Sequence, residues 1–300
     1  MVILFITIVK IKMITKVQRK TFIIRPSGRS TDFIAPSFGH GCLYNCTYCY
    51  MKRHKDVGLD IATNTGQILT EISHHAWFAN VEKPNQTHPE LITYDISCNE
   101  DFALHAKYHD WKTIFRFFRD HPLAMGSFAT KYVNKNLLKF NPKGKIRIRF
   151  SLMPQKYADF LEPSTSSIED RLWAVRDFIA AGYDVHLNFS PVIITPGWLR
   201  EYEKLFEKVN RFAKEHNWNN DLVKAEVIFL THNKQKHEYN VENELPGENL
   251  LWVPEFQETK KSQYGGINIR YKAGYKKQLV DTWIKLHDEI IPWNTIRYIF

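Results

Sequence analysis

The sequence has 300 residues, of which 44% are hydrophobic and 24% charged, and this composition excludes a collagen, a disordered chain and an integral membrane protein. The net charge of +9 at pH 7 is compatible with a polyanionic partner such as nucleic acid, although no long basic tail is present. The length fits one large α/β domain with short extensions.

The chain opens with an apolar run over residues 1–10, which is too short to span a bilayer and lacks the small-residue cleavage site of a signal peptide. We predict a strand or a frayed extension here, and Met13 is an alternative start. We therefore expect a cytoplasmic protein without membrane contact. Thiols stay reduced in that compartment, so clustered cysteines indicate a metal site rather than disulfides.

Short β-branched runs alternate with helical stretches through most of the chain, a pattern that predicts parallel strands joined by helical crossovers. The predicted strands are residues 33–38, 91–97, 126–130, 146–152, 184–189 and 226–230. The predicted helices lie near residues 63–79, 105–120, 167–181 and 197–216. The fold class is therefore α/β, a partial (β/α)6 TIM-like barrel.

Three regions follow from this pattern: an N-terminal extension at 1–32, the barrel at 33–232 and a C-terminal extension at 233–300. Within the C-terminal extension we predict a hairpin around Gly265 and Gly266. A closing helix at 276–290 and a short strand at 295–300 then finish the chain.

Four residues with chemically useful side chains stand at the ends of the first four predicted strands. Cys42, Cys98 and Lys131 follow the first, second and third strands, and Ser151 ends the fourth. In a TIM-like barrel the chemistry lies at the C-terminal strand ends. We therefore expect these four side chains to face one mouth.

Three of the four cysteines fall within eight residues, as Cys42, Cys46 and Cys49. Thiolates select soft metals, and one loop can place three of them around an iron-sulfur cube. A cube with three thiolates leaves one iron free to chelate S-adenosylmethionine, whose one-electron cleavage yields a 5′-deoxyadenosyl radical. The spacing thus indicates a [4Fe-4S] cluster and S-adenosylmethionine as cofactors.

A structural zinc site is the alternative for this cysteine cluster, with His40 or His54 as the fourth ligand. A disulfide with spare thiols is a further alternative, which a cytosolic chain disfavours.

The cysteine intervals match the CxxxCxxC motif of the radical S-adenosylmethionine superfamily, and from near Ser37 to its end the chain resembles the spore photoproduct lyase branch. The matching segments, in order, are CTYCY at 46–50, SCNED at 97–101, FATK at 128–131, RIRFS at 147–151, FLEPSTS at 160–166, AGY at 181–183, SPVI at 190–193 and GW at 197–198.

The resemblance implies a ligand set and a cofactor pocket. Cys42, Cys46 and Cys49 would hold the cluster, and the residues that bind S-adenosylmethionine would be Tyr48, Lys131 and Ser151. It also implies a radical carbon–carbon lyase that returns the DNA lesion 5-thyminyl-5,6-dihydrothymine to two thymines. Its partners would be DNA and an electron donor such as flavodoxin or ferredoxin, and the enzyme would be a monomer.

The resemblance further implies three catalytic residues. Cys98 would donate a hydrogen atom to the repaired thymine radical, and Tyr50 and Tyr264 would pass one back toward the cofactor. Taken alone, Cys98 is more typical of a small buried hydrophobe, and each tyrosine of a core or hydrogen-bonding residue.

Two positions depart from the family pattern: Glu100 stands where the family has Ser, and Gln263 where it has Arg. We expect the missing Arg to weaken phosphate contact, and a carboxylate near the lesion pocket to repel phosphate. The alternative functions are therefore a radical enzyme acting on another modified nucleobase, RNA or a peptide, and a non-catalytic nucleic-acid-binding protein with a structural metal.

Overall fold

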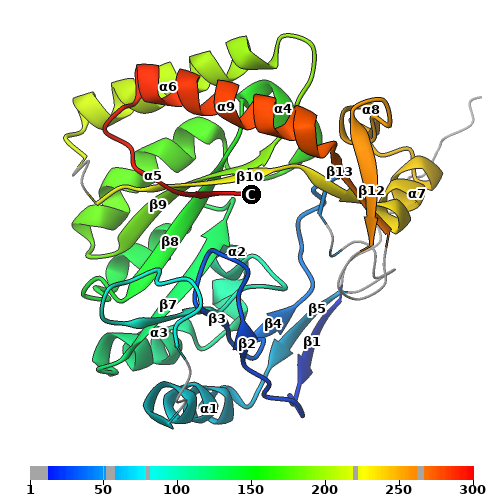
Figure 1. Cartoon of the computed structure of the whole chain (residues 1–300). Helices are drawn as coiled ribbons and strands as arrows, with labels where there is room; N and C mark the ends of the chain where they lie inside the picture. Colours follow the sequence, from blue (N-terminus) through cyan, green and yellow to red (C-terminus); the bar gives the residue numbers. More distant parts are fainter. Residues whose placement is uncertain (1–12, 50, 52–57, 79–81, 219–221, 262–266) are drawn as a thin grey trace, which may run out of the picture.

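The computed structural model describes residues 13–49, 51, 58–78, 82–218, 222–261 and 267–300. Within these ranges, eight strands form one curved sheet that carries the fold (Figure 1). In spatial order its strands are β14 (Ile296–Ile299), β10 (Ala225–Phe229), β9 (Asp184–Val192), β8 (Ile146–Leu152), β7 (Ala124–Thr130), β6 (Ile92–Asp95), β3 (Phe33–Ile34) and β2 (Arg25–Pro26).

Every neighbouring pair in this sheet is parallel except β2 and β3. All six predicted barrel strands are present, and the partial TIM-like barrel is confirmed. The outer strands β14 and β2 come from outside the predicted barrel limits, so the sheet draws on both flanking regions. The limits of the three regions themselves stay a prediction.

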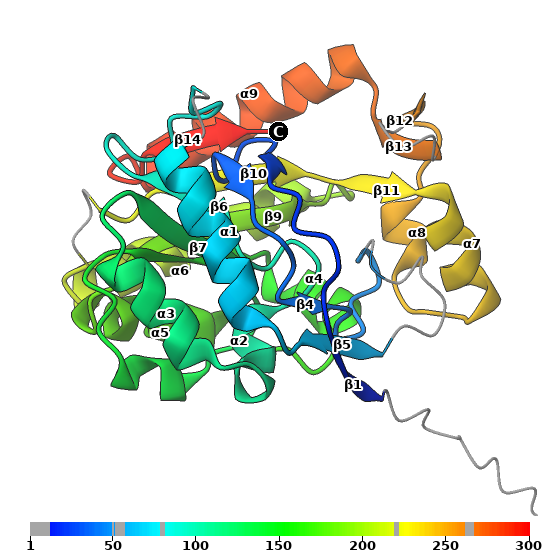
Figure 2. The same ribbon diagram turned by 90° about the horizontal axis from the view of Figure 1, so that it is seen from below.

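Helices cover the outside of the sheet (Figure 2). The longer ones are α1 (Thr65–Phe78), α3 (Trp111–Asp120), α5 (Ile168–Ala180), α6 (Trp198–Glu215) and α9 (Ala273–Ile290). Ser167 caps α5 by accepting from the amide of Asp170, and acidic residues in its first turn suit the helix dipole. Among the described residues, no helix is both long and apolar enough to cross a membrane.

The predicted helix near 105–120 is wrong in its continuity. It is divided into α2 (Phe102–His105), a 3-10 turn η2 (Ala106–Tyr108) and α3. Asp110 ends the run because its side chain accepts from the amide of Thr113 and so starts a new helix.

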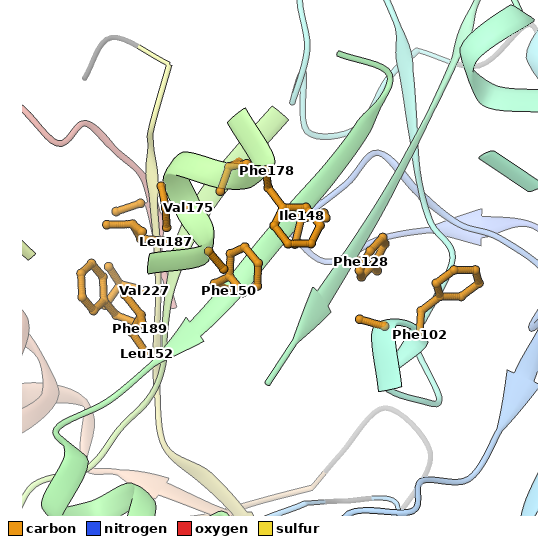
Figure 3. Close-up of a cluster of buried hydrophobic side chains, with 14 of the residues drawn as sticks. Phe102, Phe128, Ile148, Phe150, Leu152, Val175, Phe178, Leu187, Phe189 and Val227 are labelled. Carbon is orange, nitrogen blue, oxygen red and sulfur yellow. The ribbon is translucent and has the colours of Figure 1, made fainter. Parts of the chain in front are cut away.

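Strand β8 shows how the two faces of the barrel differ. Every residue of β8 is buried, and alternate side chains point to opposite faces. Ile148, Phe150 and Leu152 belong to the apolar core beneath α5, where the rings of Phe150 and Phe178 lie 5.4 Å apart (Figure 3). Burying each such side chain contributes about 1.5–3 kcal/mol.

The other face of β8 presents Arg147, Arg149 and Ser151 to the interior of the barrel. The two guanidinium groups are compensated there: Arg147 lies 2.7 Å from Asp184, and Arg149 lies 2.7 Å from Asp95. Buried charges are tolerated only when they are paired in this way. The polar interior therefore starts with ion pairs and reaches Ser151 at the C-terminal end of the strand.

Two small sheets flank the strand ends. In the described N-terminal part, β1 (Ile14–Val17) pairs with β5 (Leu59–Ala62), which pairs with β4 (Gly39–His40). In the C-terminal part, β11 (Thr231–Asn233), β13 (Ile267–Tyr271) and β12 (Gln257–Lys261) are antiparallel. The predicted hairpin is confirmed as β12 and β13, while its tip lies outside the described residues.

The remaining helices of the described residues are short. α4 (Gln155–Leu161) follows β8, and α7 (Lys234–Glu242) and α8 (Glu248–Leu251) lie beside β12 (Figure 1). A second 3-10 turn, η3 (Lys135–Lys139), follows β7.

Candidate active site

The three clustered cysteines occupy the loop that follows β4. All four cysteines of the chain are described, and none forms a disulfide. The loop starts at Gly41, which has a φ of +103°, and a Cβ there would lie 1.9 Å from the carbonyl oxygen of Gly58. Only glycine fits this close approach, so the loop is held tightly against the segment leading into β5.

The three thiols differ in their surroundings. Cys46 is buried with 6% of its surface exposed, whereas Cys42 and Cys49 are half-buried. Burial raises the pKa of the Cys46 thiol well above its ordinary value, and this thiol must lose its proton when it binds iron. The amide of Cys49 donates to the carbonyl of Cys46 at 3.1 Å, which makes a turn between these two residues.

The three thiols of this loop are the donor type that holds an iron-sulfur cluster. In a [4Fe-4S] cluster each cysteine binds a different iron, so three thiols would leave the fourth iron without a protein ligand. Among the described residues, no group of three His, Cys, Asp or Glu side chains is placed to hold a single metal ion.

Lys131 and Tyr48 meet beside this loop. The Lys131 ammonium lies 5.5 Å from the centroid of the Tyr48 ring, and the Tyr48 hydroxyl donates to the buried carboxylate of Glu162. Burial disfavours the ammonium, but nearby negative charge, that of the Glu162 carboxylate first, outweighs it and raises the pKa of Lys131. Lys131 is therefore a charged group suited to the carboxylate of S-adenosylmethionine.

Arg171 holds Glu162, the carboxylate that contacts Tyr48. Its guanidinium donates to Glu162 and to the carbonyl of Ser151, both at 2.8 Å. Glu162 thus accepts from both Tyr48 and Arg171. Sequence reasoning did not single out Glu162 or Arg171, because nothing in their local spacing shows that they meet.

Ser151 lies at the end of β8, opposite Asn188 of β9. The Asn188 amide donates to the Ser151 hydroxyl at 3.4 Å, and its own oxygen is buried without a partner among the described residues. A buried acceptor left without a donor is costly. It fits a ligand that brings hydroxyl groups, such as the ribose of S-adenosylmethionine. Asn188 was missed, although an Asn within an apolar strand is a usable signal.

Cys98 lies in the loop after β6, three residues before Asp101, whose carboxylate makes several hydrogen bonds at the C-terminal end of the sheet. Asp101 accepts from the Thr130 hydroxyl at 2.7 Å and from the Lys131 amide at 2.9 Å. It also caps α2 through the amide of Leu104. The structure thus links the segments that carry Cys98 and Lys131. The predicted residues Tyr50 and Tyr264 lie outside the described residues.

The expectation for Glu100 is wrong. Its side chain has no exposed surface and contacts His105 and His109, so it cannot repel a phosphate at the surface. A buried carboxylate is tolerated when it is hydrogen-bonded, and His105 and His109 provide these bonds to Glu100.

Comparison with known proteins agrees with this geometry. The sequence model described as spore photoproduct lyase matches residues 6–300. The chain belongs to the spore photoproduct lyase family. It is 29% identical over 287 residues to spore photoproduct lyase of Bacillus subtilis. The aligned region covers 93% of this chain and 80% of that protein. The corresponding values for the protein of Geobacillus sp. are 28% over 292 residues, 93% and 80%.

Solved spore photoproduct lyases share the fold. One is complexed with dinucleoside spore photoproduct; it has a TM-score of 0.84 and 23% identity, and the match covers 96% of this chain and 82% of that one. A mutant with bound AdoMet and the same dinucleoside has a TM-score of 0.84 and 22% identity, with the same coverage. As a family member, the chain is a radical S-adenosylmethionine lyase whose cofactors are a [4Fe-4S] cluster and S-adenosylmethionine.

Proposed function

We propose that this spore photoproduct lyase family member reverses 5-thyminyl-5,6-dihydrothymine in DNA to two thymines. One observation carries the proposal. Cys98 and Lys131 follow β6 and β7, and Ser151 ends β8, so these three residues stand at the C-terminal ends of neighbouring parallel strands. The cysteine loop after β4 is joined to the Cys98 loop by the hydrogen bond from the Gly41 amide to the Asn99 carbonyl, in a chain that matches the family over residues 6–300.

The residues divide into two groups. Cys42, Cys46 and Cys49 hold the cluster, and Lys131 and Ser151, with Tyr48 beside them, bind S-adenosylmethionine. When bound, these cofactors supply the carbon radical that takes a hydrogen atom from C6 of the lesion.

Cys98 completes the repair. Once the methylene bridge breaks, an allylic thymine radical remains, and the weak S–H bond of Cys98 gives it a hydrogen atom. The sulfur becomes a thiyl radical. A phenol O–H of Tyr50 or Tyr264 would then give its hydrogen atom to the thiyl radical and restore the Cys98 thiol, and the tyrosyl radical would regain a hydrogen atom from the cofactor side. A one-electron donor of the flavodoxin or ferredoxin type supplies the initial electron.

Positive charge near the hairpin supports a DNA substrate. Burial lowers the pKa of Lys276, and the neighbouring cations Arg270, Arg29 and Lys260 lower it further, so these four basic side chains are close enough to interact. Arg270 is paired with Glu258 at 2.9 Å. Clustered cations of this kind bind phosphates. A lesion must leave the base stack to reach strand ends in a barrel, and phosphate contacts would hold the flanking backbone while it does.

The test is turnover of a dinucleotide spore photoproduct by the anaerobically reconstituted, reduced enzyme. We expect thymine release together with 5′-deoxyadenosine. The matched variant Cys98→Ala should keep its iron and cofactor cleavage while the product radical forms adducts instead of thymine. Formation of 5′-deoxyadenosine without turnover of the lesion by the wild type would overturn the proposal and favour another modified nucleobase, RNA or a peptide.

A further inference from the structure

Glu100, His105 and His109 form a buried cluster below the cysteine loop. One carboxylate oxygen of Glu100 accepts from Nδ1 of His105 and from Nε2 of His109, each at 2.9 Å. The side chains of Glu100 and His105 have no exposed surface, and that of His109 has 2%. The imidazole of His109 also stacks on Phe102 at 5.0 Å, which fixes its plane.

This cluster reaches the cysteine loop through His105. The amide of Leu43, next to Cys42, donates to Nε2 of His105 at 3.3 Å. Because Nε2 accepts, the proton of the neutral imidazole sits on Nδ1, where it donates to Glu100. By accepting from Nδ1, Glu100 leaves Nε2 of His105 as the nitrogen that accepts from the loop amide.

The carboxylate also packs directly against the strand that leads into the loop. A Cβ on Gly39 would lie within 2.4 Å of the carboxylate atoms of Glu100, so the absence of a side chain at Gly39 makes room for it. Such a close approach of a buried carboxylate to backbone is uncommon and fixes its position.

The same residue belongs to the Cys98 loop. The amide of Glu100 donates to the carbonyl of Ser97 at 3.1 Å, which closes a turn around Cys98. The next contact joins the two loops directly, since the amide of Gly41 donates to the carbonyl of Asn99 at 3.0 Å. The backbone of Glu100 is thus in one loop while its side chain orders the other.

We propose that Glu100 is a positioning residue that, through His105, fixes the cluster-binding loop relative to the hydrogen-atom donor Cys98. The inference rests on the proposed function, because it assigns a purpose to the distance between these two segments. Hydrogen transfer depends steeply on how close the S–H bond lies to the product radical. A few tenths of an ångström of play between the loops would therefore divert the radical into side products.

The first measurement uses the protein without its cluster. Cysteine alkylation under native conditions, quantified for each residue by mass spectrometry, reports opening of each loop. Glu100→Ala removes two charge-assisted bonds, so we expect Cys42 and Cys98 to react about tenfold faster than in the wild type. Glu100→Gln keeps the shape and one acceptor, and it should restore most of the protection.

The second measurement uses the reconstituted enzyme. In Glu100→Ala we expect iron content and 5′-deoxyadenosine formation near those of the wild type, but a smaller share of thymine and a larger share of adduct per cofactor cleaved. Glu226→Gln changes another buried carboxylate, whose direct partners are Arg149, His186, Arg297 and Tyr298 rather than a residue of either loop, and it controls for a general loss of stability.

Unchanged alkylation rates and product shares in a folded Glu100→Ala variant would overturn the inference. An equal change in Glu226→Gln would overturn it too, because the effect would then follow from stability alone. If Glu100→Ala fails to fold, Glu100→Gln takes its place. Wild-type protection and wild-type product shares in Glu100→Gln support the inference. Changes in Glu100→Gln that equal those in Glu226→Gln count against it. Lack of thymine release by the wild type would instead contradict the proposed function, while the alkylation result would still stand.

Discussion

The side-chain amide of Asn240 donates to the carbonyl oxygen of Thr47 at 3.0 Å, across 193 residues of sequence. Thr47 follows Cys46 directly, so this contact joins α7 to the cysteine loop. Glu248 accepts from the same amide and is held in turn by His232 at 3.0 Å. Helix α7 therefore holds the loop at Thr47, whereas His105 holds it at Leu43.

Asn240→Ala should loosen this loop. The substitution leaves the buried Thr47 carbonyl without its donor, which costs about 1–3 kcal/mol. We expect a chelator to remove iron from the reconstituted variant about tenfold faster than from the wild type. Asn243→Ala is the control, because Asn243 is exposed at the end of the same helix and bonds to Tyr239 of that helix. Equal rates of iron loss in the two variants would contradict this role of the contact between Asn240 and Thr47.

Lys131→Met should weaken S-adenosylmethionine binding. The variant keeps the length of the side chain but removes the positive charge of the ammonium. In the wild type the pKa of Lys131 is raised, because nearby negative charge, that of Glu162 first, outweighs the effect of burial. Loss of one charge-assisted contact predicts an affinity at least about tenfold lower, measured by equilibrium dialysis against the reconstituted protein. Lys135→Met makes the same charge change on the exposed turn η3 and should bind normally. Normal binding by Lys131→Met would remove Lys131 from the cofactor site.

Lys276→Ala should reduce the salt dependence of DNA binding. Lys276 lies among Arg270, Arg29 and Lys260, so it is placed to contact a phosphate. Loss of one such contact lowers the slope of log K against log salt by about 0.9 for duplex DNA. The neighbouring Lys277 is the matched control.

Lys277 is bound to Asp281 at 2.8 Å on the exposed face of α9. We therefore expect Lys277→Ala to keep the wild-type slope in a titration of a lesion-containing duplex at several salt concentrations. Identical slopes for both variants would place the phosphate contacts elsewhere.

Glu226→Gln should make the fold less stable at neutral pH and flatten its acid response. Burial opposes ionisation of Glu226, but Arg149, His186 and Arg297 outweigh it and lower its pKa from 4.5 to about 2. A lowered pKa stabilises the fold above about pH 4.5, and this contribution, on the order of 3 kcal/mol, is lost as the pH falls toward 2. Removing the charge also leaves Arg149 and Arg297 less compensated inside the barrel.

Urea unfolding at pH 7, 4.5 and 3 measures this effect. The wild type should lose stability between the upper and lower values, and Glu226→Gln should lose less. Glu169→Gln is the control, because Glu169 is exposed and pairs with Lys208 at the surface, where such pairs contribute little. A parallel acid response of wild type and Glu226→Gln would show that other carboxylates dominate it.

Local patterns in the sequence sufficed for the barrel and for the residues at its strand ends. Strand β8 matches its predicted limits at residues 146–152, and the parallel order follows from alternating strands and helices. The three cysteines were identifiable because their spacing is itself the chemical signal. Parallel strands end at one edge, which is why Cys98, Lys131 and Ser151 could be assigned to one mouth before the structure was known.

Other features depend on contacts between segments far apart in the sequence. Strand β14 pairs with β10, although its own residues show only that a strand is possible. Glu100 was expected near the lesion pocket because it stands where the family has Ser, and only the folded chain brings His105 and His109 around it. Asp110 divides the predicted helix because its side chain caps α3.

The sequence by itself therefore determined which chemical groups are available: three closely spaced thiols in one loop, and a cation and a further thiol after two of the predicted strands. Only the tertiary structure decided how the cysteine loop is held, through Asn240 at Thr47 and His105 at Leu43. The physical reason is that ligand spacing is a property of a short segment. Buried hydrogen bonds instead depend on which distant donors and acceptors the packed fold leaves together.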